Sequence, residues 1–196
     1  DYGNLFTRDF YLPTGDLRDL RSSIKRADVI IVTKCPGELS ENERTELVKE
    51  IAPLAHQQLY CSTIAYGIPY HITLGNEKEL DESTEVLLIT GIANPRPLKM
   101  LLENQIHTYY MMHYNDHHIF TIDDWNEIRK KFNSIENRKK ILLTTEKDAM
   151  RLMKFGEQMN GMPFYVIPIE HRFLFEQAEE FLSSVGNFIK NFKQPS

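Results

Sequence analysis

The sequence predicts an α/β fold: a mostly parallel sheet with flanking helices, in two lobes joined by a short two-stranded linker. Apolar, β-branched runs alternate with amphipathic runs, as in βαβ units. Residues 27–35, "ADVIIVTKC", form a continuous apolar run that is typical of a strand buried on both faces. Residues 58–73, "QLYCSTIAYGIPYHIT", interrupt the alternation with β-branched and aromatic residues, which indicates extended structure. We therefore expect a first lobe over residues 1–57, a linker over 58–73 and a second lobe over 74–196.

The helix expected after the first strand has a clear start signal. Ser40 is a good N-cap, and Glu43 stands at the capping-box position three residues later. The apolar residues Leu47, Ile51 and Leu54 share one face, which predicts packing against the preceding strand.

The second lobe is expected to contain four strands, with helical runs after the first three and a long helix at the end of the chain. The strands are predicted at 85–90, 107–113, 140–145 and 164–169. Pro95 suits a first helical turn, and Thr121 should cap a helix whose apolar face is Trp125, Ile128 and Phe132. The last helix should run from about 172 to 192. Its apolar stripe, expected in the core, is Leu174, Ala178, Phe181, Leu182, Val185, Phe188, Ile189 and Phe192.

Composition narrows the classes of function. The 196 residues carry 23 Lys and Arg against 28 Asp and Glu, a net charge of −5 that argues against a general nucleic-acid binder. Cys35 and Cys61 are far apart in the sequence, so we expect free thiols rather than a disulfide. No apolar run reaches the ~18 residues that suggest a transmembrane helix, and no signal peptide is recognisable. The start at "DYGNLF", without Met, suggests an excised part of a longer protein.

Ionisable residues follow several of the predicted strands. Asn115-Asp116-His117-His118 follows the second strand of the second lobe, and Thr145-Glu146-Lys147-Asp148 follows the third. Because ligands bind at the carboxyl ends of strands in open parallel sheets, these residues are expected to lie at one functional edge.

Each of these residues also has an ordinary structural interpretation. An Asp after a strand, such as Asp116, often caps a helix or makes an Asx-turn. Adjacent His117 and His118 suggest metal, but a zinc site needs three or four suitably spaced ligands, so we predict no metal site here. Glu146 and Lys147 are also typical of a charged helix start. Arg18 lies among other charges in "GDLRD", either as part of a solvated cluster or as a phosphate-binding fork.

Five segments in the same order resemble the tetraacyldisaccharide 4'-kinase family, the lipid A 4'-kinases of Gram-negative bacteria. They are "LPTGDLRD", "RADVIIVTK", "GIANP", "DHHIFTIDD" and "TTEKDAMRL", and they span residues 12 to 152. Five ordered matches are far more specific than one motif.

The resemblance implies a P-loop kinase domain joined through a two-stranded linker to a second, Rossmann-like α/β domain. It also implies a peripheral enzyme at the cytoplasmic face of the inner membrane. This enzyme would transfer a phosphoryl group from ATP, with Mg²⁺, to the 4'-hydroxyl of a lipid A disaccharide precursor. The family's phosphate loop and acidic metal-binding segment do not occur in this chain, so residues 1–57 would be the C-terminal part of the kinase domain. ATP and Mg²⁺ would be bound mainly by a part upstream of Asp1, and the chain alone would be inactive.

The resemblance also implies roles for individual residues. His117 matches the family's catalytic His, which is expected to act with a carboxylate of the missing part to take the proton of the sugar hydroxyl. Arg18 matches a candidate ligand of the substrate phosphate, whereas Asp19 replaces the family's Glu, which leaves the role of this acid open. His118 falls at a variable position. The predicted substrate-binding residues are Arg18, Asp19, Asp116, Glu146, Lys147 and Asp148.

Two other functions are compatible with the residues alone. A Rossmann-like module could bind a nucleotide or sugar phosphate without catalysis. A metal-dependent hydrolase could use Asp116, His117 and His118. A phosphate loop encoded upstream of Asp1 would distinguish the kinase from both.

Overall fold

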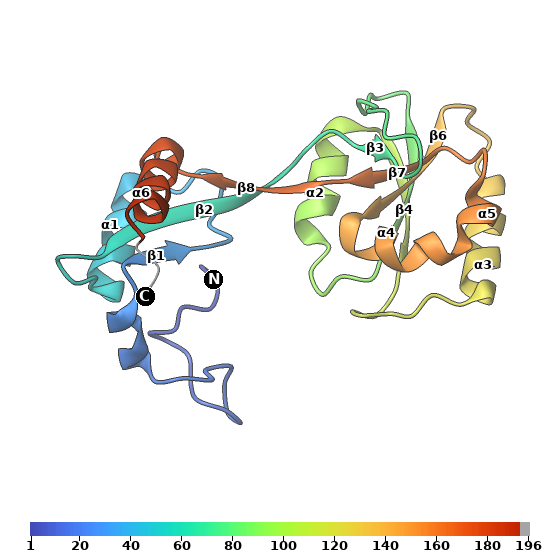
Figure 1. Cartoon of the computed structure of the whole chain (residues 1–196). Coiled ribbons are helices and arrows are strands. Elements are labelled where there is room, and N and C mark those ends of the chain that lie inside the picture. The colour runs from blue at the N-terminus through green and yellow to red at the C-terminus, as the bar shows by residue number, and fades with distance from the viewer. Residues whose placement is uncertain (193–196) are drawn as a thin grey trace. The chain divides into compact units, whose positions relative to one another are not determined.

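The computed structural model describes residues 1–192, and these form two compact units (Figure 1). Unit 1 combines Asp1–Ala65 with the segment from His171 onward, and unit 2 is the continuous segment Tyr66–Glu170. The chain therefore passes between the units twice, once after Ala65 and once after Glu170. The α/β class and the mostly parallel pairing predicted from the sequence are confirmed.

Unit 1 is built on a three-stranded sheet with the order β1-β2-β8. Its elements are the 3₁₀ helix η1 (Arg21–Arg26), β1 (Val29–Val32), α1 (Glu41–Ile51), β2 (Gln58–Tyr66), β8 (Ile169–Phe173) and α6 (Ala178–Asn191). β1 and β2 run parallel, with Val29 opposite Gln58. The core is formed by Leu5, Val32, Cys35, Leu39, Leu47, Ile51, Cys61 and Leu174.

The predicted start of α1 is confirmed. Ser40 accepts a hydrogen bond from the Glu43 backbone N–H, and the Glu43 carboxylate accepts one from the Ser40 N–H. Leu47 and Ile51 are buried, whereas Leu54 lies beyond the helix and is exposed. Cys35 and Cys61 are free thiols, as expected, and burial raises the pKa of Cys35 to about 12.

The prediction that residues 27–35 form a strand buried on both faces is wrong. β1 covers only four residues, lies at the edge of its sheet, and leaves Ile31 38% exposed. A run of β-branched residues indicates that a strand forms. Whether that strand is buried depends on the strands and helices that pack around it, which the run itself does not specify.

Unit 2 is a five-stranded sheet with the order β3-β7-β6-β4-β5 and helices on both faces. Its strands are β3 (Tyr70–His71), β4 (Glu85–Thr90), β5 (Thr108–His113), β6 (Lys140–Thr145) and β7 (Phe164–Ile167). Its helices are α2 (Arg96–Gln105), α3 (Ile122–Asn133), α4 (Glu146–Leu152), η2 (Met153–Phe155) and α5 (Gly156–Met159). All neighbouring strands are parallel except β3, which is antiparallel to β7.

The alternation of side chains along β4 explains the layers of unit 2. Val86 and Leu88 pack with Leu98 of α2, and Leu87 and Ile89 pack on the opposite face with Trp125 of α3. Figure 1 shows α2 and α3 on opposite sides of the strands. The strand is therefore apolar on both faces, as expected for a parallel sheet covered by helices.

The division into units differs from the predicted lobes at the end of the chain. The second lobe was expected to extend from 74 to 196, but the segment from His171 onward belongs to unit 1, where Leu174 donates its backbone N–H to Cys61 O (2.8 Å). The linker predicted within 58–73 does not pair with itself: β2 and β3 belong to different sheets, and β2 neighbours β8. The returning strand is more than 100 residues away in sequence, so local patterns do not reveal it.

The last helix also differs from expectation. α6 begins at Ala178, because 172–173 belong to β8. Its first turns contact the unit 1 sheet, where Phe181 packs edge-on against Tyr60. Further along, the apolar stripe is not core, because Leu182, Phe188 and Ile189 are each about two-thirds exposed. Among the described residues, no helix combines the length and apolarity needed to cross a bilayer.

Candidate functional site

The ionisable residues predicted to gather at the carboxyl ends of the unit 2 strands do form one cluster. β4, β5 and β6 are adjacent and parallel, so the turns that follow them lie along one edge of the sheet. Gly91 follows β4, Asp116 and His117 follow β5, and Lys147 and Asp148 follow β6 in the first turn of α4. The contacts among these residues connect three segments that are distant in sequence.

Asp148 is the buried centre of the cluster, with no exposed surface. Its Oδ2 accepts hydrogen bonds from the Gly91 N–H (2.8 Å) and the Thr145 hydroxyl (3.0 Å), while Oδ1 accepts one from Arg151 (3.2 Å). A Cβ on Gly91 would lie 3.1 Å from Asn115 O and 3.3 Å from Asp148 Oδ1, so only glycine fits this turn without adjustment. With its oxygens engaged and buried, Asp148 holds the turn after β4 against the start of α4 rather than facing a ligand.

Arg151 links this buried carboxylate to the predicted catalytic histidine. One guanidinium nitrogen donates to Asp148 Oδ1, and another lies 3.1 Å from Nδ1 of His117. Because arginine can only donate, Nδ1 must accept, and the neutral imidazole then carries its proton on Nε2. The sequence interpretation missed Arg151. The available signal was its position three residues after Asp148 on a helix, where the two side chains are neighbours.

His117 has an unusual backbone and an accessible side chain. Its φ is +62°, in the left-handed region that non-glycine residues adopt infrequently, and its side chain is 73% exposed. The Asp116 carboxylate accepts the backbone N–H of His117 at 3.0 Å, and Oδ2 of Asp116 lies 3.6 Å from Nε2 of the ring. The imidazole is thus bracketed by a guanidinium and a carboxylate and is open to solvent.

Asp116 forms an ion pair with Lys147, whose Nζ lies 2.7 Å from Oδ1. The pKa of Asp116 is below its usual value, chiefly because Lys147 donates this hydrogen bond. Asp116 and Lys147 are therefore brought together with His117, as the sequence interpretation expected of an edge of the sheet. Both side chains are partly exposed and could contact a ligand.

His118 and Glu146 have structural contacts. The His118 ring stacks on Tyr114 (4.7 Å between centroids), and its Nε2 lies 2.9 Å from Oδ2 of Asp124. Burial disfavours ionisation of Asp124, but hydrogen bonds from the Thr121 backbone and His118 outweigh this effect and lower its pKa. Glu146 accepts the backbone N–H of Ile169 (3.2 Å) and so fastens the turn after β7.

The capping role predicted for Thr121 is confirmed. Its hydroxyl accepts the Asp124 N–H, and the Asp124 carboxylate accepts the Thr121 N–H.

The two adjacent histidines have different partners. His117 lies beside Arg151 and Asp116, whereas His118 contacts Asp124 and Tyr114. Within residues 1–192, no group of three or more His, Cys, Asp and Glu side chains is placed to hold a metal ion.

The two remaining candidates, Arg18 and Asp19, belong to unit 1, whereas the residues of the cluster belong to unit 2. Arg18 is exposed, and no hydrogen bond or ion pair involves its side chain within the described part of the chain. Asp19 accepts the backbone N–H of Leu20 (2.7 Å) and pairs with Arg26 (3.0 Å). These contacts lower the pKa of Asp19, with the Leu20 hydrogen bond the largest cause.

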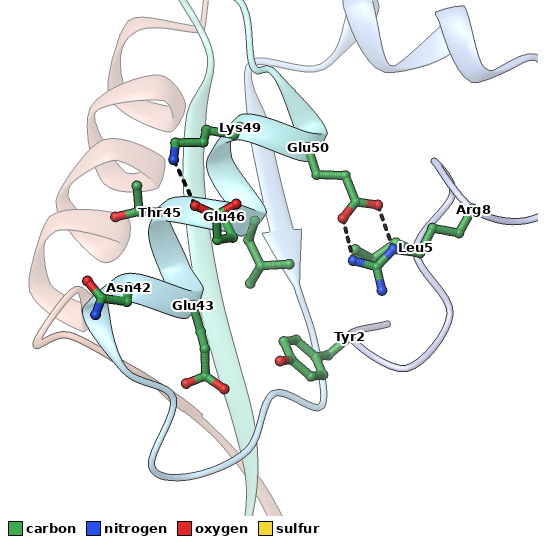
Figure 2. Close-up of a pocket in the computed structure, with 10 residues that line it drawn as sticks. Tyr2, Leu5, Arg8, Asn42, Glu43, Thr45, Glu46, Lys49 and Glu50 are labelled. Atoms are coloured by element: carbon green, nitrogen blue, oxygen red, sulfur yellow. Dashed lines mark hydrogen bonds and ion pairs between the residues drawn. The ribbon is translucent and has the colours of Figure 1, made fainter.

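A pocket of about 430 Å³ in unit 1 lies between the N-terminal segment and α1 (Figure 2). Its wall includes Tyr2 and Leu5, and Arg8 forms an ion pair there with Glu50. None of the predicted site residues lines this pocket. Arg8 pairs with Glu50 and Lys49 pairs with Glu46, whereas the Glu43 carboxylate accepts hydrogen bonds from Ser40.

Comparison with known proteins gives a consistent result. The family model described as tetraacyldisaccharide-1-P 4'-kinase matches residues 1–187. Relatives named tetraacyldisaccharide 4'-kinase include proteins from Phocaeicola vulgatus (34% identical, covering 97% of this chain and 54% of that protein) and Flavobacterium johnsoniae (34%, 99% and 54%). Another is from Porphyromonas gingivalis (32%, 98% and 56%). The chain thus spans about half the length of the curated relatives it matches.

A solved structure has the same fold. It is the "apo" form of LpxK from Aquifex aeolicus in complex with ATP, with a TM-score of 0.53 and 17% identity, covering 91% of this chain and 48% of that one. At this identity the likeness supports the fold alone. The match of the family model over nearly the whole chain shows that the chain belongs to the tetraacyldisaccharide-1-P 4'-kinase family.

Proposed function

We propose that this chain is the C-terminal part of an enzyme that transfers the γ-phosphoryl group of ATP to the 4'-hydroxyl of a tetraacyldisaccharide 1-phosphate, a precursor of lipid A. The observation that carries this proposal is the family match over residues 1–187. The relatives are named tetraacyldisaccharide 4'-kinase, a name that gives the acceptor class and the position phosphorylated by those proteins. The cluster around His117 adds proton-handling groups at the ligand-binding edge of a parallel sheet.

His117 is proposed to take the proton of the sugar hydroxyl as the phosphoryl group is transferred. In the structure its Nδ1 accepts from Arg151, so this nitrogen has no free lone pair for a substrate. We propose that the substrate hydroxyl replaces Arg151 at Nδ1. The 73% exposure of the side chain leaves room for this exchange.

Asp116 and Lys147 are proposed to contact the sugar or its phosphate beside His117. Lys147 supplies a partly exposed ammonium, and Asp116 supplies an acceptor held in place by the His117 backbone N–H. Arg18, exposed and without a partner among the described residues, is proposed to bind the 1-phosphate. Asp148 and Glu146 are proposed to hold the loops that carry Asp116, His117 and Lys147. For Asp19 we propose a structural role, through its ion pair with Arg26.

The residues present do not fit Mg²⁺. Asp116 and Asp148 are engaged by Lys147 and Arg151, and no cluster of three or more potential ligands occurs within residues 1–192. We therefore assign Mg²⁺ and the phosphates of ATP to the half of the relatives' length that this chain does not match. The reaction is proposed to take place at the cytoplasmic face of the inner membrane, with the enzyme bound peripherally.

The proposal is tested in the protein that carries this chain together with an upstream phosphate loop. His117→Ala should lower kcat by about 10²- to 10⁴-fold, the usual contribution of a general base, and leave the KM for ATP nearly unchanged. Transfer of ³²P from ATP to the lipid disaccharide measures both. His107→Ala removes an exposed imidazole of unit 2 outside the cluster and should keep full activity.

The 196-residue chain alone should form no product in the same assay. An unchanged kcat in His117→Ala would exclude His117 from proton transfer. An upstream reading frame without a phosphate loop would exclude the kinase activity itself.

A further inference from the structure

The segment from Phe10 to Arg26 in unit 1 combines an apolar tip with exposed basic residues. Phe10, Leu12 and Leu20 are 65%, 59% and 63% exposed, and Tyr11 is 45% exposed. Figure 1 shows this deep-blue segment projecting away from the strands of unit 1. Large apolar side chains that gather in one exposed segment are typical of an interaction surface.

The tip is held in one conformation by its own hydrogen bonds. Leu12 donates its N–H to Leu17 O (3.1 Å), and Leu17 donates its N–H to Phe10 O (3.0 Å). The Asp9 carboxylate accepts the N–H groups of Phe10 and Asp16. A Cβ on Gly15 would lie 2.3 Å from Phe10 O, so this turn requires glycine. Because the backbone is already ordered, burying these side chains against a partner costs little further backbone conformational entropy.

The charges of the segment favour an anionic partner. The chain as a whole has a net charge of −5, but this segment contains Arg18, Arg21, Lys25 and Arg26 against Asp16 and Asp19. Asp19 is paired with Arg26, and the Asp16 carboxylate accepts a hydrogen bond from Asn4. Arg18 and Lys25 are exposed. Apolar tips flanked by basic residues bind anionic bilayers through both insertion and electrostatic attraction.

We propose that Phe10, Tyr11, Leu12 and Leu20 insert into the surface of an anionic bilayer, with Arg18 and Lys25 at the level of the lipid headgroups. This inference rests on the proposed function at a membrane surface and names the part of the chain that makes the contact. It also places Arg18, the proposed ligand of the substrate phosphate, where a lipid phosphate would lie.

The second exposed apolar surface, on α6, has the opposite balance of charge. Phe188 and Ile189 are 64% and 66% exposed, and α6 carries Glu179 and Glu180 in its first turn against Lys190 in its last. α6 therefore provides a matched control, because Phe10 and Phe188 are equally exposed residues of the same type.

The experiment uses the 196-residue chain and two single variants, Phe10→Trp and Phe188→Trp. The native chain has one tryptophan, Trp125, which is fully buried in unit 2 and gives a constant background. Vesicles contain equal parts of phosphatidylglycerol and phosphatidylcholine, with or without brominated acyl chains. We expect the added emission of Phe10→Trp to shift to the blue and to be quenched by the brominated lipid, and that of Phe188→Trp to remain unquenched.

Removing the apolar tip should weaken binding. Tyr11→Ser with Leu12→Ser should lower the vesicle partition coefficient by about tenfold to a hundredfold. Circular dichroism of the double variant checks that the fold is kept. Higher salt, or vesicles of phosphatidylcholine alone, should also weaken binding, because the headgroup contacts are electrostatic.

Quenching of Phe188→Trp alone, quenching of neither variant, or equal binding to neutral vesicles would each overturn the proposal. Vesicle binding is measured without ATP or the disaccharide. Its failure would therefore leave the proposed kinase activity standing, and loss of the kinase assignment would leave the vesicle result unaffected.

Discussion

Single residues in the unit 2 cluster differ in how their charges are compensated. Asp148 is buried and receives three donors, whereas Asp116 is partly exposed and is compensated mainly by Lys147. His117 lies between Asp116 and the guanidinium of Arg151. The groups that can meet a ligand are therefore the exposed ones, and the buried carboxylate supports them.

Lys147→Met should raise the pKa of Asp116 toward its usual value of about 3.9. In the native chain the pKa of Asp116 is lower in the folded state than in the unfolded state. The ion pair with Lys147 therefore stabilises the fold fully at pH values above the unfolded-state pKa of Asp116. This stabilisation is lost as the pH falls through the lower, folded-state pKa. A carboxyl ¹³C NMR titration of the chain measures the change. Lys130→Met, an exposed lysine of α3, should leave the midpoint of Asp116 unchanged.

The sequence located most of this cluster but not its connections. Asp116, His117, Lys147 and Asp148 could be predicted, because strand ends are recognisable and parallel strands align them. The contact of Arg151 with His117 spans 34 residues, and His117 has a left-handed backbone. Neither property follows from residue spacing, so this partner appeared only in the structure.

Helices and strands are joined in unit 2 by a small number of buried polar contacts. Asp148 is the main one, because it ties the first turn of α4 to the turn after β4. Loss of its carboxylate would leave the Gly91 N–H and one guanidinium nitrogen of Arg151 without this acceptor in a closely packed region.

Asp148→Ala should therefore lower the free energy of unfolding of unit 2 by about 3 kcal/mol, the range for breaking a buried ion pair. Urea denaturation followed by the emission of buried Trp125 measures it. Asp123→Ala, an exposed acid on α3, is expected to change stability by no more than about 0.5 kcal/mol. Equal effects of the two substitutions would contradict the bracing role of Asp148.

Amphipathic patterns identified the helices correctly but did not always identify what covers them. The stripe Trp125, Ile128 and Phe132 on α3 is buried against the sheet as expected. The stripe on α6 has the same periodicity, yet Phe188 and Ile189 are exposed. Periodicity reports that a face is apolar, and the neighbour that covers the face is set by the tertiary structure.

The whole molecule consists of one continuous unit and one unit assembled from both ends of the chain. Unit 1 takes β8 and Leu174 from the segment that follows Glu170, whereas unit 2 uses only Tyr66–Glu170. The predicted boundaries at 57 and 73 were close to the first crossing. The second crossing was missed, because β8 pairs with a strand on the far side of unit 2 in sequence.

Truncation after Glu170 should leave unit 2 folded and unfold unit 1. The emission maximum of Trp125 should match that of the intact chain, and amide protection from hydrogen exchange should be lost for α1 but retained for α3. A segment limited to 66–170 should give the same Trp125 emission. Loss of native emission after truncation would show that the two units depend on each other for stability.

The split composition of unit 1 has a consequence for synthesis on the ribosome. Domains generally fold as units as they emerge, N-terminal ones first. Here residues 1–65 emerge before unit 2 but need β8, which follows unit 2, to complete their sheet, so unit 2 can fold before unit 1 does. During that interval the strand β2 and the exposed tip at Phe10–Leu12 are available to chaperones or to a bilayer before unit 1 is complete.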